Sequence, residues 1–501
     1  MNSCSRHRLS HQPLRLLAAA AVLSAGVATG IASAQPAQPL PNDSVIRFAG
    51  ADTIGIGLIP PLAAAWAKKL RLPAIRTEQG ADPLEYSLYA DGAESARKVR
   101  LDVKLHGTLT GTEPVLRGSA DFWMSGRQAR ESDLVAARQR NVQNVPTVTQ
   151  FLAPGVENII ALDGIAVIVH PANPVRKLSF AQMKDIFTGR ITNWSQLGGA
   201  DLPINVYAPD PTSGTFERVC STVIGVANAQ ACGQQMVRLA APHFKAVDDL
   251  SDTVAGNPAA IGWVGLVAKR SARSVQIVTE CGSTVDADPF YVKADEYPLT
   301  SRYYLYVSPT RPPTPAARDF LSFTLSQDGQ TALKAAGAVD LLPSTATEGY
   351  AADRLDGAGN ALDGGRTRVR QTDVRAFEEA TQNADRLSIT FRFLEGTDNL
   401  DARAEADLGR LAALMQTPDY AKSQLILIGY SAARGDYGAN RSLSRERSQN
   451  VRNRLVNSLG VTNVTSLGVG PAAPVACNTE NSTNAAMNQR VEAWIRKSPG
   501  G

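Results

Sequence analysis

Histidine and cysteine are scarce in this sequence of 501 residues, which contains five of each. Only His106, His170 and His243 lie beyond residue 34, and no two cysteines stand in a Cys-x-x-Cys pair. Protein zinc sites are usually built from closely spaced cysteines and histidines. We therefore predict no zinc and no other metal site.

A strong charge of either sign is also missing. The chain has 51 Lys+Arg and 47 Asp+Glu, a formal net charge of +4. Loss of the first 34 residues, which hold Arg6, Arg8 and Arg15 and no acid, would lower this charge to +1. Nucleic-acid-binding proteins carry more positive charge, so no nucleic acid partner is predicted. Beyond residue 34 no apolar run is long enough to span a bilayer.

Enzyme motifs are absent too: there is no Gly-x-Ser-x-Gly, no P-loop and no His-Glu-x-x-His. The pair Gly55 and Gly57 lacks the third glycine of a dinucleotide fingerprint. We predict that the chain is not an enzyme and has neither catalytic residues nor a cofactor.

The N-terminus has the pattern of a secretory signal peptide over residues 1–34. Three arginines come first, residues 16–27 are apolar, and Ala32-Ser33-Ala34 supplies an A-x-A cleavage site. Cys4 precedes the apolar run, so it is no lipoprotein acceptor. The alternative is an uncleaved anchor, which the short run disfavours. We predict a periplasmic protein.

Four cysteines would remain after cleavage, and an even number in an oxidising compartment favours disulfides. Three pairings are possible. The simplest joins Cys220 to Cys232, with Cys281 and Cys477 either bridged or free.

The rest of the chain divides by composition, which at 44% hydrophobic and 20% charged residues suits a globular protein of two or three domains. Residues 35–44 form a Pro-rich leader, and 45–348 alternate apolar strands with amphipathic helices, which predicts α/β architecture. Strands are predicted at 159–162, 165–169, 261–264 and 303–307, and helices at 58–70 and 179–187.

Residues 349–373 are glycine-rich and charged and predict a flexible linker. A smaller second unit covers 374–498, with strands at 387–391, 425–428 and 491–495 and a helix at 402–415.

Three loops rich in small and hydroxyl residues, 50–53, 107–111 and 212–215, precede predicted helices. Free backbone N–H groups and hydroxyls at a helix start can bind an anion. The alternative for any single loop is an ordinary Ser/Thr N-cap.

The motifs of residues 45–345 resemble those of phosphate-type (type II) solute-binding proteins of ABC importers. They are LDGIAVIVHPANPV at 162–175, DIFTGRITNW at 185–194, GSADFWMSGR at 118–127 and SGT at 213–215. The resemblance implies two lobes around a ligand cleft that closes by a hinge. It also implies an ABC importer permease as partner.

The resemblance assigns a set of oxyanion-binding residues: Thr53, Thr108, Ser125, Arg127, Ser213, Gly214 and Thr215. Two positions depart from the family. Pro209 replaces its phosphate-binding arginine, and Gly126 replaces the carboxylate that accepts the phosphate's proton. Arg127, next to Gly126, is placed to supply a positive charge to the oxyanion. The alternative is a structural role for this arginine.

Residues 385–497 resemble the OmpA-like peptidoglycan-binding domain through NRSLSRER at 440–447 and NQRVE at 488–492. The resemblance implies an α+β fold and makes Arg447 and Asn440 candidate peptidoglycan-binding residues. Ala432 replaces the family's aspartate, and Asp436 cannot be assumed to substitute for it. For Asn440 and Arg490 a structural role is the alternative.

We therefore expect a periplasmic solute-binding protein for phosphate or a similar oxyanion, associated with the cell wall or outer membrane. The alternative is a structural or interaction protein of the envelope that uses binding folds without their ligands. An envelope hydrolase has the least support.

Overall fold

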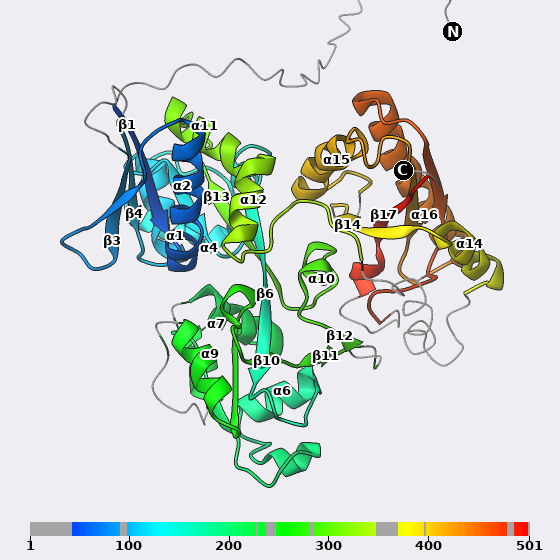
Figure 1. Ribbon diagram of the computed structural model, residues 1–501, viewed down its shortest axis with the longest axis horizontal. Coiled ribbons are helices and arrows are strands. Elements are labelled where there is room, and N and C mark those ends of the chain that lie inside the picture. The colour runs from blue at the N-terminus through cyan, green and yellow to red at the C-terminus, as the bar shows by residue number, and fades with distance from the viewer. Residues whose placement is uncertain are drawn as a thin grey trace, which may run out of the picture. The chain divides into compact units, whose positions relative to one another are not determined.

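The computed structural model describes residues 43–90, 98–211, 213–226, 229–236, 244, 247–279, 282, 284–346, 369–394, 397–433, 435–477 and 485–498 (Figure 1). The predicted signal peptide, nearly all of the leader, Cys281 and most of the predicted linker lie outside these residues. Contacts within the chain group Leu40–Gly501 into one compact unit. Among the described helices none is long and apolar enough to cross a membrane.

One lobe of the first domain is built on parallel strands with an antiparallel edge. The strand β1 (Asp43–Gly50) pairs in parallel with β4 (Lys98–Lys104) and with β5 (Phe122–Ser125). The edge is formed by β2 (Arg76–Gln79) and β3 (Glu85–Ala90). The helices of this lobe are α1 (Asp52–Gly57), α2 (Ile59–Lys69), α3 (Thr112–Arg117), α4 (Glu131–Gln139), α5 (Val148–Phe151), α11 (Pro315–Leu325) and α12 (Gln327–Ala335).

A single buried strand, β6 (Glu157–Val169), connects this lobe to the next. Its first half, up to Gly164, pairs with β13 (Thr300–Tyr306), and its second half, from Ile165, pairs with β9 (Ala260–Gly265). The sheet therefore continues from one lobe into the other along one strand, as Figure 1 shows for β6. The predicted strands 159–162 and 165–169 are parts of this strand.

The second lobe surrounds the far half of β6. Its strands are β7 (Lys177–Ser179), β8 (Asn205–Tyr207), β10 (Arg273–Ser274), β11 (Gln276–Val278) and β12 (Thr284–Val285). Its helices are α6 (Phe180–Phe187), α7 (Gly214–Val219), α8 (Ala229–Gln235), α9 (Val247–Gly256) and α10 (Pro289–Lys293). Cys220 and Cys232 form a disulfide, as the sequence predicts.

The C-terminal unit is a four-stranded sheet with helices. The strand order is β14 (Asp385–Phe391), β17 (Arg490–Arg496), β15 (Gln424–Tyr430) and β16 (Val464–Gly468), and only β15 and β16 run in parallel. Its helices are α14 (Gln371–Thr381), α15 (Ala402–Met415) and α16 (Tyr437–Asn453). Leu408 and Leu411 of α15 and Val451 of α16 pack with Leu425 and Leu427 of β15 in one apolar core. Cys477 is disulfide-bonded, and its partner lies outside the described residues.

Most predicted elements are confirmed, and α15 has the predicted bounds. The helix predicted over 58–70 is confirmed as α2, and a separate short helix, α1, precedes it with a break at Leu58. Pro60 and Pro61 lie in the first turn of α2, where missing backbone N–H groups cost nothing, so the sequence restarts a helix there.

Candidate functional site

Two of the predicted loops face each other across the space between the lobes. Gly126 follows β5, and Gly214 begins α7 on the other lobe. A Cβ placed on Gly214 would lie 3.9 Å from the Gly126 Cα, which is van der Waals contact, so the two loops approach closely. The Gly126 N–H also donates to the Thr108 hydroxyl at 3.3 Å. Thr108, Gly126 and Gly214 therefore lie together.

The Thr53 loop joins the same region from a turn that requires glycine. Gly50 has φ +134°, and a Cβ there would lie 2.1 Å from the Met124 carbonyl oxygen. Beyond that turn, the Thr53 side chain interacts with the Tyr303 hydroxyl. Burial raises the pKa of the neighbouring Asp52, and the negative charge of Asp210 on the other lobe raises it further. The Asp210 carbonyl in turn accepts from the Ser213 N–H at 2.9 Å, so the acid that acts on Asp52 belongs to the same turn as Ser213.

Ser213 is the N-cap of α7 and accepts from the Phe216 N–H at 3.2 Å. This is the ordinary capping role that the sequence leaves open as the alternative. The cap leaves the first backbone N–H groups of α7, including those of Gly214 and Thr215, without a partner in the helix ladder. Ser213 and Thr215 are buried.

The side chains of Ser125 and Arg127 form hydrogen bonds with residues close to them in the sequence. The Ser125 hydroxyl is buried and donates to the Arg127 carbonyl oxygen. The Arg127 guanidinium donates to both carboxylate oxygens of Asp133, at 2.9 and 2.7 Å. Burial would lower the pKa of Arg127, but Asp133 and Glu217 outweigh it and raise that pKa. These contacts favour the structural alternative for Arg127, while its role towards a ligand stays a prediction.

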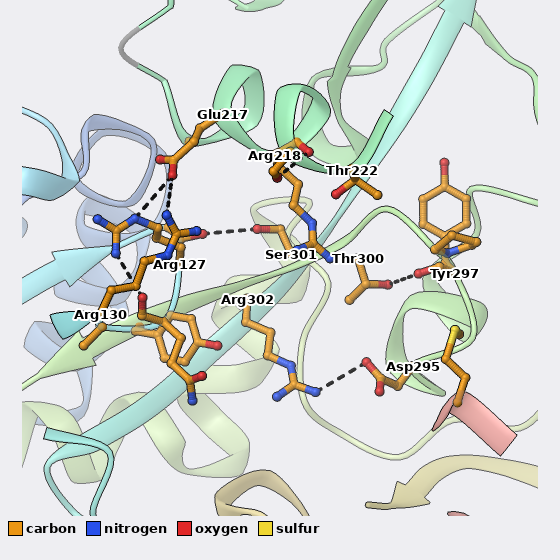
Figure 2. A pocket seen from close by; sticks show the side chains of 18 of the residues that line it. Arg127, Arg130, Glu217, Arg218, Thr222, Asp295, Tyr297, Thr300, Ser301 and Arg302 are labelled. Carbon is orange, nitrogen blue, oxygen red and sulfur yellow. Dashed lines mark hydrogen bonds and ion pairs between the residues drawn. The ribbon is translucent and has the colours of Figure 1, made fainter. Parts of the chain in front are cut away.

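A cavity of about 870 Å³ opens beside Gly126, Arg127 and Gly214 (Figure 2). Its wall carries hydroxyl groups of Thr222, Thr300 and Ser301 and the guanidinium groups of Arg130, Arg218 and Arg302. The predictions from sequence contained neither Arg218 nor Arg302. For Arg218 a signal exists: it stands four residues after Gly214, which places both on one face of α7.

Most charges of this wall are paired. Arg130 contacts Glu217 at 2.9 Å, an ion pair between the two lobes. Arg302 lies 3.4 Å from Asp295, which also contacts Arg392 and Arg403. Burial alone would raise the pKa of Asp295, but these three arginines hold it at about 2. In the described part of the chain, Arg218 forms no ion pair and its side chain donates no hydrogen bond.

In the C-terminal unit, Arg447 lies in α16 and is almost completely buried. Its guanidinium donates to the Gln489 side chain at 3.2 Å and stacks over the Phe393 ring, with Asp398 at 3.6 Å. Burial lowers the pKa of Arg447. Asn440 lies one turn into the same helix, and its N–H donates to the Asp436 carbonyl.

Ala432, at the position of the expected aspartate, is buried, and Asp436 does not occupy its place. The Asp436 carboxylate accepts from the Ala439 N–H at 2.8 Å as the N-cap of α16. Arg490 is fully buried, pairs with Glu492 and covers the Tyr430 ring. These contacts support the structural alternative for Arg490.

One exposed group of side chains, Asp82, Glu85 and His106, brings three potential metal ligands together. Lys104 contacts Glu85 at 2.9 Å, so a cation of the chain already faces this carboxylate. Nothing else at this edge indicates a metal.

Comparison with known proteins identifies two matching families. Residues 84–328 match the PBP superfamily domain, and residues 392–488 match the OmpA family. Protein SphX of Synechocystis sp. is 25% identical over 266 residues, which cover 50% of this chain and 73% of SphX. The phosphate-binding protein PstS of Pseudomonas aeruginosa is 23% identical over 350 residues, covering 65% of this chain and 94% of PstS.

Solved structures of similar chains include a transport receptor and a cell wall anchor. An ABC-type phosphate transport receptor from Vibrio cholerae covers 58% of this chain and 98% of its own length, with 20% identity and a TM-score of 0.40. The cell wall anchor of the T6SS from Pseudomonas aeruginosa covers 26% of this chain and 99% of its own length, with 24% identity and a TM-score of 0.20.

Proposed function

Because this chain joins a PBP superfamily domain to a C-terminal OmpA family domain, we propose that it binds phosphate or a related small oxyanion in the cell envelope. The relatives named as phosphate-binding proteins support the ligand class. The observation that carries the proposal is the meeting of the Thr108–Gly126 and Ser213–Gly214 loops between two lobes. Hydroxyl and backbone N–H donors there suit a tetrahedral oxyanion. The proposed ligands are Thr53, Thr108, Ser125, Arg127, Ser213, Gly214 and Thr215.

The proposal includes delivery of the oxyanion to an ABC importer permease and attachment to the cell wall through the OmpA family domain. A periplasmic location after signal peptide cleavage fits both. The alternative, an envelope protein that uses both folds only for protein contacts, predicts no oxyanion binding by a folded chain.

Titration calorimetry of the purified mature chain with phosphate, sulfate and molybdate tests the proposal. We expect phosphate to bind roughly ten- to a hundredfold more weakly than to relatives that retain the arginine, because Pro209 offers no cation. Thr108→Ala and Ser213→Ala should weaken binding further, whereas Ser119→Ala, at an exposed loop, should not. A folded chain that binds none of these anions would favour the alternative.

A further inference from the structure

The cavity beside the predicted oxyanion loops is far larger than phosphate requires. At about 870 Å³ it lies in the range of pockets that enclose whole organic ligands. A tetrahedral oxyanion held between Gly126 and Gly214 would occupy only one end of it. The open cleft therefore has room for a ligand larger than inorganic phosphate.

Among the residues that the structure describes, Arg218 is the arginine of this cavity wall that forms no ion pair. It lines the cavity from α7, and Figure 2 shows its side chain extending towards Thr300 and Ser301. The Arg218 side chain is exposed to the solvent of the cavity; partial desolvation by the surrounding wall lowers its pKa, and the charge of Asp295 opposes this shift. A guanidinium surrounded by other arginines, with no ion pair to a described residue, suits an anionic group of a ligand.

The other three arginines of the wall are each paired with an acid of the chain and are therefore less suited to bind an anionic group of a ligand. Arg127 pairs with Asp133, Arg130 with Glu217, and Arg302 with Asp295. Gly214, at the oxyanion end, and Arg218 lie one turn apart on the same face of α7. A ligand with two anionic groups separated by a short organic body would reach both.

We propose that the solute is an organic phosphate with a second acidic group, held by its phosphate at the Thr108 and Ser213 loops and by its second group at Arg218. This inference rests on the proposed function, and it adds the chemical class of the solute. Hydroxyl groups of Thr222, Thr300 and Ser301 surround the organic body between the two ends.

The test compares three probes on the full mature chain by titration calorimetry: inorganic phosphate, glycerol 3-phosphate and 3-phosphoglycerate. The last two have the same length, and only 3-phosphoglycerate carries a carboxylate. We expect 3-phosphoglycerate to bind at least tenfold more tightly than glycerol 3-phosphate. Arg218→Gln should remove that difference and leave inorganic phosphate unchanged within twofold. Arg190→Gln, an exposed arginine of the same lobe, is the control.

Each other outcome contradicts the inference in a different way. Equal affinity of the wild type for both esters would show that Arg218 does not bind the carboxylate of 3-phosphoglycerate. An equal loss for all three probes in Arg218→Gln would show that this arginine holds the phosphate itself. Binding of inorganic phosphate alone would overturn the inference and leave the proposed function standing. Binding of no probe by a folded chain would remove the proposed function as well.

Discussion

Asp163 is a buried acid at the centre of the strand that joins the lobes. Its carboxylate accepts from the Tyr303 hydroxyl at 2.9 Å and from the Leu266 N–H at 3.1 Å. Burial outweighs these bonds and raises the pKa of Asp163 to about 6. Between pH 4 and 6 the folded state therefore keeps a proton that the unfolded state releases, so stability falls as pH rises through this window.

We predict that Asp163→Asn removes this loss, because the amide stays neutral and keeps one acceptor oxygen. Relative to wild type, its free energy of unfolding should rise between pH 4.5 and pH 7 by about 2 kcal/mol. Urea denaturation followed by tryptophan fluorescence at both pH values measures this change. Asp419→Asn, at an exposed position, is the control, and a parallel pH dependence in Asp163→Asn and wild type would contradict the prediction.

Side-chain partners were harder to predict from the sequence than loop positions. The loops around Thr108 and Ser213 follow from their small and hydroxyl residues, and the structure brings them together. The pairing of Arg127 with Asp133 depends on how the chain turns into α4, which residue spacing does not determine. Tyr303 reaches Thr53, 250 positions earlier, because β13 pairs with β5 and β5 pairs with β1, the strand that precedes the Thr53 loop.

At the scale of elements, α16 carries Arg447 and Asn440, the two residues predicted to bind peptidoglycan. Asp436 is the N-cap of this helix and is therefore held at the helix start. Arg447 lies in the third turn, and its side chain is buried inside the unit. In the proposed attachment to the cell wall, the Arg447 guanidinium would form a forked contact with a carboxylate of diaminopimelate, an amino acid of peptidoglycan that also carries an ammonium group. The ammonium of that ligand finds no acid at Ala432, and desolvating it without a counter-charge costs several kcal/mol.

We therefore predict weak binding of the purified mature chain to peptidoglycan sacculi. In a pull-down, Ala432→Asp should increase the bound fraction several-fold, and Arg447→Ala should reduce it. Because Arg447 also packs on Phe393, circular dichroism must show that the variant is folded, and Arg447→Lys offers a milder replacement. Strong wild-type binding that Ala432→Asp does not improve would show that the missing aspartate is not the defect.

Helices and strands were predictable wherever their apolar period is uninterrupted. The helix α15 is an example, since its leucines repeat along one face and its N-cap Asp401 marks the start. The strand β6 was predicted as two pieces because Asp163 and Gly164 interrupt its apolar run. Only a tertiary partner makes an acid acceptable there, and Tyr303 comes from a distant strand.

At the scale of the whole chain, the two domains are predicted to be joined covalently twice. Cys477 is disulfide-bonded, and Cys220 and Cys232 bond to each other. If Cys4 leaves with the signal peptide, Cys281 is the remaining partner. The linker of 349–373 would then be the first connection between the domains and the Cys281–Cys477 bond the second.

We predict that trypsin cuts the linker at Arg354, Arg366 or Arg368 and that the two fragments stay together without reductant. Non-reducing and reducing gels of the same digest measure this, and peptide mass mapping identifies the bond. Cys477→Ser is the matched control and should release the C-terminal fragment without reductant. Separation of wild-type fragments under non-reducing conditions would contradict the pairing.

The strand β6 also has a consequence for how the first domain comes apart. Because one continuous strand belongs to the sheets of both lobes, neither lobe can lose it without breaking the hydrogen-bond ladder of the other. Two lobes connected only by loops could melt one after the other, but these two share a cooperative unit. The amide protons in the middle of β6 should therefore exchange with solvent only through global opening, and the domain should show a single calorimetric transition.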